Sequence, residues 1–185
     1  MSSMDSFPEI EKRWFMHVGY LAQNWAAIET VLDNIVRQLH VHYDGQRIEP
    51  SPPQSFKRKR TFIRKVFAGH PALNEHSESL AELLETATRL AAIRHWALHS
   101  GWAETNMDDA LLGRYKASDP LRWEQQRFSL EEIFQAAVES AKLAFVLTLF
   151  SQRAFSIKPP DEIDRLLDGL DTQIEAAVVR RDPTG

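Results

Sequence analysis

The chain has no cysteine among its 185 residues. This absence excludes disulfides, cysteine-based zinc sites and a cysteine nucleophile, and it fits a reducing compartment. The sequence also lacks a glycine-rich phosphate loop and the glycine-flanked serine of the nucleophile elbow. The common nucleotide-binding loop and the common serine-hydrolase site are therefore not expected.

A targeting leader and long apolar runs are missing as well. The first residues, MSSMDSFPEIEKRW, contain no basic segment followed by an apolar one, so no secretory signal is expected. No uninterrupted apolar run reaches the roughly 18 residues that span a bilayer. We therefore expect a cytoplasmic protein without a membrane partner.

What the chain does contain is the composition of an ordinary soluble domain, with 43% hydrophobic and 26% charged residues. The length predicts one domain over residues 1–185. The net charge of −4 gives no overall attraction to nucleic acid, so any such binding would need a local basic patch.

The spacing of the apolar residues predicts an all-α fold, an up-and-down bundle of about five helices with a small β-hairpin-like insertion. In the first helix, apolar residues recur every three or four positions from Trp14 to Leu39. Ser129 and Glu132 have the spacing of a capping box that opens a later helix. The expected elements are a long helix at 8–43, a basic helix at 53–68, a third helix at 74–100, the insertion at 108–128, a central helix at 129–156 and a last helix at 160–179.

The third helix carries an unusual group of side chains in the stretch RLAAIRHWALHSGW, residues 89–102. Arg94 falls on the helix's apolar stripe, where an unpaired guanidinium is costly unless it meets a carboxylate, a bound anion or water in a cleft. His95 follows directly, and His99 lies one turn further on the same face. An arginine with two imidazoles suits a phosphate, because arginine grips its oxygens and histidine moves protons near neutral pH.

These residues resemble the signature of the HEPN superfamily of all-α domains. That signature is an arginine, a polar residue directly after it, and a histidine a few residues later, and here Arg94, His95 and His99 occupy those positions with four residues between Arg94 and His99. Ser100-Gly101 follows, close to the family's frequent His-Gly ending. The segment NWAAIETVL, with Trp25 and Glu29, is similar to the family's long opening helix, and the resemblance covers about residues 8–155.

The resemblance implies a metal-independent endoribonuclease without a cofactor, often a toxin or defence effector, that cuts RNA in a cleft shared by a homodimer. It implies that Arg94 holds the scissile phosphate, that His99 is the general acid or base, and that His95 orients the phosphate or the partner imidazole. An antitoxin or a nucleotidyltransferase would be a further partner.

Other interpretations of the same residues stay open. Glu29 could form an ion pair with Arg94, and His99 could serve only as a cap at the negative end of the helix dipole. The domain could instead be a non-catalytic module that binds a nucleotide or a protein, or a dimerising scaffold. No metal site is predicted, because His40 and His42 are two residues apart on a helix and point in different directions.

The basic helix and three tryptophans also have two interpretations each. The basic residues could contact RNA phosphates or simply form a solvated face. Trp96, Trp102 and Trp123 could line a base-stacking cleft or pack the insertion onto the bundle. The candidate RNA-binding residues are Lys57, Arg58, Lys59, Arg60, Arg64 and Lys65.

Overall fold

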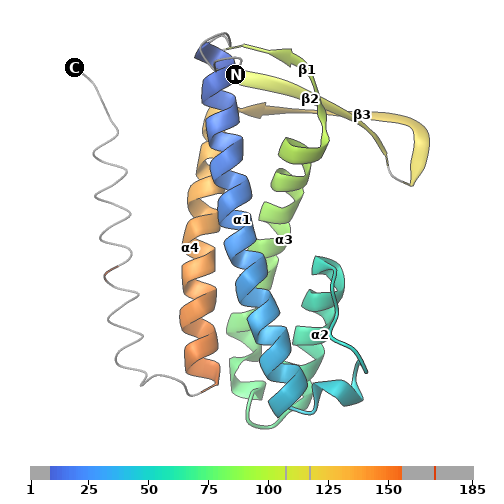
Figure 1. Ribbon diagram of the computed structural model, residues 1–185, viewed down its shortest axis with the longest axis vertical. Helices are drawn as coiled ribbons and strands as arrows, with labels where there is room; N and C mark the ends of the chain where they lie inside the picture. Colours follow the sequence, from blue (N-terminus) through green and yellow to red (C-terminus); the bar gives the residue numbers. More distant parts are fainter. Residues whose placement is uncertain (1–8, 107, 117, 156–168, 170–185) are drawn as a thin grey trace, which may run out of the picture.

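The computed structural model describes residues 9–106, 108–116, 118–155 and 169, so the predicted last helix at 160–179, apart from residue 169, lies outside the described residues. Three long helices run along the molecule, and a small sheet crosses one of its ends (Figure 1). In chain order the elements are α1 (Glu9–His42), the 3-10 turn η2 (Gly45–Arg47), α2 (Phe56–Gly69), the 3-10 turn η3 (Asn74–His76), α3 (Ser77–His99), β1 (Gly101–Thr105), β2 (Asp109–Lys116), β3 (Asp119–Ser129) and α4 (Leu130–Ala154).

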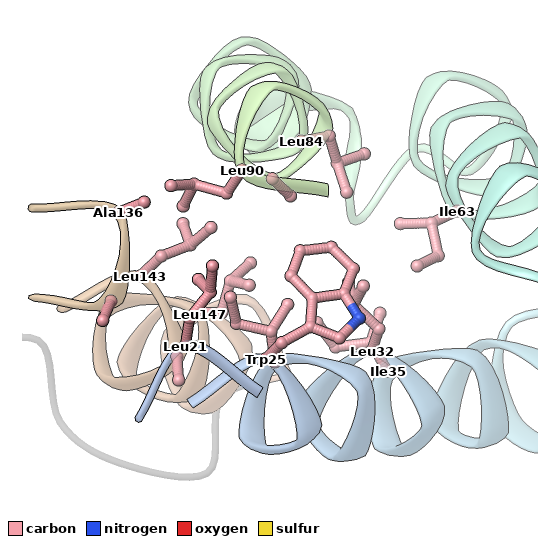
Figure 2. Packing of buried hydrophobic residues seen from close by; sticks show 14 of the residues in the cluster. Leu21, Trp25, Leu32, Ile35, Ile63, Leu84, Leu90, Ala136, Leu143 and Leu147 are labelled. Atoms are coloured by element: carbon pink, nitrogen blue, oxygen red, sulfur yellow. The ribbon is translucent and has the colours of Figure 1, made fainter. Parts of the chain in front are cut away.

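The first helix confirms the apolar seam that its sequence predicts. α1 is 34 residues long, roughly 51 Å at 1.5 Å per residue, and it lies beside α4 with α3 packed against both (Figure 1). Trp25 points from α1 into the core, where leucine and isoleucine side chains from all four helices surround it (Figure 2). The buried residues of the seam are Trp14, Leu21, Trp25, Ile28, Leu32, Ile35 and Leu39, with Val18 partly buried.

The prediction of an all-α bundle of about five helices with a hairpin-like insertion is wrong. The part of the chain that the structure describes has four α-helices and a three-stranded antiparallel sheet in the order β1-β2-β3. β2 and β3 form the expected hairpin, but β1, only five residues long, pairs with β2 as a third strand. Strand pairing depends on residues distant in sequence, and five residues after a helix end give too short an alternation to reveal it.

The sheet packs one face on the bundle because its residues alternate. Ala110, Leu112 and Phe128 are buried, whereas Tyr115 and Trp123 lie exposed on the opposite face. The far end of the β2–β3 hairpin projects sideways beyond the helices (Figure 1). This overhang places one strand, β2, above the side of α3.

The start of α1 anchors the other end of the sheet. The rings of Trp14 and Trp102 meet edge to face with centroids 5.6 Å apart. Trp14 Nε1 also donates a hydrogen bond of 3.3 Å to the carbonyl of Asn106. Of the two interpretations of Trp102, the structure therefore supports packing.

The fourth helix, α4, begins at the predicted capping box and contains a long apolar stretch. Ser129 Oγ accepts a hydrogen bond from the Glu132 amide, and the Glu132 carboxylate accepts one from the Ser129 amide. Within the described residues, α4 is the one helix long and apolar enough to cross a membrane. Its most apolar stretch of 18 residues has a mean hydropathy of 1.5, and 44% of that stretch is buried in the structure. It packs against α1 and α3.

Candidate functional site

The three motif residues lie in the last two turns of α3, which ends at His99. The chain becomes extended at Ser100 and enters β1 at Gly101. Arg94 is half-buried, while His95 and His99 are exposed. A histidine in the last turn interacts favourably with the negative end of the helix dipole, so the position of His99 fits both a cap and a functional group.

Arg94 is directed toward His99, with Nη1 3.1 Å from His99 Nε2. A guanidinium can only donate hydrogen bonds, so His99 Nε2 accepts and its ring proton lies on Nδ1. The Nε–H group of Arg94 is buried, and no described residue accepts a hydrogen bond from it. Arg94 therefore keeps one donor that its described neighbours leave unsatisfied.

His95 lies beside this pair, with its ring centroid 4.9 Å from that of His99. Partial burial of the ring lowers the pKa of His95 below its ordinary value of 6.5, and the positive charge of Arg114, then His99 and Arg94, lower it further. A lowered pKa keeps the imidazole neutral at pH 7. His95 is therefore able to accept a proton near neutral pH.

A cleft of about 470 Å³ opens beside the motif, between α1, the start of α2, α3 and strand β2. Pockets of this size hold small ligands such as a nucleotide. In Figure 1 the first turn of α2 lies below the overhanging sheet, beside α3. The residues that line the cleft are Trp25 and Glu29 from α1, Phe56, Lys57 and Arg60 from α2, Thr88, Ala91, Ala92, Arg94, His95 and Trp96 from α3, and Arg114 from β2.

The cleft is rich in cations. Lys57, Arg60, Arg94 and Arg114 line it, against one carboxylate, that of Glu29. Arg60 donates a hydrogen bond to the Thr88 hydroxyl, which holds its guanidinium against α3. Such a concentration of positive charge on a chain whose net charge is −4 favours an anionic ligand.

Arg114 was not recognised from the sequence. Its guanidinium carbon lies 3.9 Å from the centroid of the Trp96 ring, and its Nη1 is buried without a hydrogen-bond partner among the described residues. Alternation along β2 was the available signal, because Ala110, Leu112 and Arg114 share the face that packs on the bundle. Of the three tryptophans singled out in the sequence, Trp96 is the one that lines the cleft.

The structure places Glu29 and Arg94 in the same cleft but does not pair them. The Glu29 carboxylate forms no ion pair or hydrogen bond with any other described residue. The contact that Arg94 makes is with His99 instead. The carboxylate that the sequence offers as a partner for Arg94 is therefore left available in the cleft.

The predicted RNA-binding residues divide into three groups. Lys57 and Arg60 line the cleft. Lys59 is buried, and its ammonium lies 2.5 Å from an Asp33 carboxylate oxygen, which removes it from any RNA-contacting surface. The others lie away from the cleft lining: Arg58 pairs with Glu49 at 2.9 Å, Arg64 with Glu85 at 3.8 Å, and Lys65 is exposed.

Neither protein-family comparison nor searches of curated proteins and solved structures find a match for this chain. Within the described residues, no three histidine or acidic side chains are grouped so as to hold a metal ion. The case for a function therefore rests on the chemistry of the cleft.

Proposed function

We propose that the protein is an HEPN-like, metal-independent endoribonuclease that binds an RNA strand in the cleft beside α3. One observation carries the proposal: two arginines of the cleft, Arg94 and Arg114, each have a buried N–H group without an acceptor. Leaving such donors unsatisfied costs about 1–3 kcal/mol each. A phosphodiester supplies both the acceptor oxygens and the negative charge that these groups require.

The proposed reaction uses the RNA's own 2′-hydroxyl as the nucleophile. His95, kept neutral by its lowered pKa, accepts the proton of the 2′-hydroxyl as that oxygen attacks the adjacent phosphorus. The bond from phosphorus to the 5′-oxygen breaks, leaving a 2′,3′-cyclic phosphate. Arg94 and Arg114 stabilise the charge that develops on the phosphate oxygens.

His99 supplies the second proton transfer in this proposal. When Arg94 turns its N–H groups to the phosphate, the Nε2 of His99 loses its present hydrogen bond and becomes free to carry a proton. The protonated imidazole then donates that proton to the leaving 5′-oxygen. Water returns the two imidazoles to their starting states.

The HEPN resemblance extends the proposal to a cytoplasmic homodimer with a toxin or defence role, controlled by an antitoxin or a nucleotidyltransferase. The exposure of His95 and His99 supports the dimer, because a second copy could approach them. Sedimentation at micromolar concentration should give a species of twice the chain mass of 21.3 kDa. A single species at the chain mass would contradict the shared cleft.

The test of activity is cleavage of an end-labelled single-stranded RNA in the presence of a chelator. Wild-type protein should cut the strand, and His95→Ala should lower the rate by about 10²–10⁴, the usual contribution of a general base. His42→Ala, an exposed histidine at the end of α1, is the matched control and should cut at the wild-type rate. Equal rates for wild type and His95→Ala would contradict the assignment, and RNA binding without cleavage would favour the non-catalytic module.

A further inference from the structure

The carboxylate of Glu29 has no role in holding a phosphate. It is the one acid that lines the cleft, it is half-buried, and no other described residue pairs with it, although four cations line the same space. A carboxylate only accepts hydrogen bonds and repels phosphate oxygens. A ligand that satisfies the whole cleft must therefore carry both N–H donors and negative charge.

We infer that Glu29 recognises a guanine base of the bound RNA strand, an inference that rests on the proposed function. Guanine presents N1–H and the N2 amino group side by side, and these two donors match the two oxygens of one carboxylate. Adenine and cytosine each place an acceptor nitrogen next to their amino group, and uracil has a single N–H between two carbonyls. Guanine is the one RNA base that makes two hydrogen bonds to Glu29 without an opposing acceptor.

The surroundings of Glu29 suit a base. Glu29 follows Trp25 by one turn of α1, and the Trp25 and Phe56 rings meet edge to face with centroids 5.2 Å apart. Trp96 also lines the cleft, and the Arg114 guanidinium lies over its ring. Single-stranded RNA is bound by stacking its bases on aromatic rings or guanidinium planes and by hydrogen bonds to their Watson–Crick edges. In this cleft the Arg114 guanidinium offers the plane and the Glu29 carboxylate offers the hydrogen-bond acceptors.

The main structural alternative for Glu29 is the ion pair with Arg94. That pair would satisfy the buried Nε–H of Arg94, yet the structure leaves this N–H without a partner and directs Nη1 to His99. The two side chains line one cleft without pairing. A nucleotide suits such a cleft, because it carries both N–H donors on its base and negative charge on its phosphate.

The test measures binding to uncleavable RNA, so that it does not depend on nuclease activity. Nine-residue 2′-O-methyl oligouridines with a central G, A, C, U or inosine are titrated by fluorescence anisotropy. Wild-type protein should bind the G strand about 10-fold more tightly than the A, C and U strands, within the range expected for a bidentate base contact. Inosine lacks the N2 amino group and should fall between G and the other bases.

Two variants complete the test. Glu29→Gln should bind all five strands within about 2-fold of one another, because an amide cannot accept both hydrogen bonds. Glu82→Gln, which changes an exposed acid on α3 outside the cleft lining, should keep the preference for G. Melting curves establish that both variants are folded.

Several results would overturn the inference. They are equal affinity of wild-type protein for the four bases, equal affinity for G and inosine, or an unchanged preference in Glu29→Gln. GMP that competes as strongly as the G strand would assign the site to a free nucleotide and overturn its assignment to RNA. Binding with the expected preference, together with no cleavage of ordinary RNA, would overturn the proposed nuclease and leave the role of Glu29 supported.

Discussion

The number of cations in the cleft predicts how steeply RNA binding depends on salt. Each phosphate neutralised in a single strand contributes about −0.7 to the slope of log K against log salt concentration. Lys57 and Arg60 would each neutralise one phosphate, and Arg94 and Arg114 share the scissile phosphate, so the wild-type slope should be about −2.1. Between 50 and 200 mM salt, the affinity should fall by about 18-fold.

The perturbation is the double variant Lys57→Gln, Arg60→Gln, which removes the two cations that α2 gives to the cleft. Its slope should be about −0.7, and its affinity should fall by only about 3-fold over the same range of salt. The control is Arg64→Gln, Lys65→Gln, which removes the same charge from the next turns of the same helix, away from the cleft lining. The control should keep a slope close to that of the wild type.

The assay is fluorescence anisotropy of a labelled 2′-O-methyl oligouridine at four salt concentrations. Melting curves should show that both double variants are folded. A wild-type slope in the cleft variant would refute the reasoning, because the strand would then not contact α2 through the cleft. Equal reductions in both variants would mean that the strand responds to the overall charge of α2 and not to these two positions.

Three further predictions concern the fold and the electrostatics of the motif. Gly45→Ala should lower the free energy of unfolding by about 1–3 kcal/mol in urea denaturation, because an added Cβ would lie 2.7 Å from both a backbone oxygen of α1 and the buried Phe62 ring. A urea midpoint equal to that of the wild type would contradict this crowding. Asp33→Asn should lower the free energy of unfolding by about 1–3 kcal/mol in the same assay, because the substitution leaves the buried ammonium of Lys59 without its carboxylate partner. An unchanged free energy of unfolding would show that water reaches this ammonium. The NMR titration midpoint of His95 should lie below 6.5 and should rise in Arg114→Met, because burial and the charge of Arg114 both disfavour the protonated imidazole. The reaction rate should fall as the pH drops through this pKa, because His95 then loses the ability to accept a proton. A midpoint that the substitution does not move would contradict the role of Arg114.

The folded pKa of His95 also fixes the sign of its effect on stability. A lowered pKa means that the unfolded chain binds the proton more readily, so His95 destabilises the fold as the pH falls from about 6.5 toward the folded pKa. Below the folded pKa the penalty is fully present. His95→Gln should therefore be less sensitive to acid in this range than the wild type, as measured by thermal melting at several pH values.

Helices with a long, local apolar pattern were predictable from the sequence. In α1, apolar residues recur every three or four positions over many turns, and the structure contains the helix that this spacing predicts. The capping box at Ser129 and Glu132 is a local signal, and the helix begins where it predicts. The apolar pattern of α2 also predicts the burial of Lys59, which the run of basic residues obscures. Lys59 lies three residues after Phe56 and four before Ile63, the spacing of the buried face, so its burial follows from the helix period.

The sheet and the second arginine of the cleft were not predictable in the same way. β1 is defined by its pairing with β2, and the register that brings Trp102 opposite Leu112 depends on tertiary packing. Arg114 reaches the cleft because β2 lies over α3 and aligns its guanidinium with Trp96. The sequence identified the motif on α3 but not the strand that completes the cleft around it.

The central claim is that the cleft binds a phosphodiester and that the 2′-hydroxyl of RNA attacks it. The most direct measurement uses DNA strands that contain one ribonucleotide, of each base in turn, incubated with the protein in a chelator and analysed by mass spectrometry. The account predicts a cut only after the ribonucleotide, with a 2′,3′-cyclic phosphate on the product, and no cut by His95→Ala. Cleavage of the all-DNA strand, a product without a cyclic phosphate, or intact strands after incubation with wild-type protein would contradict it.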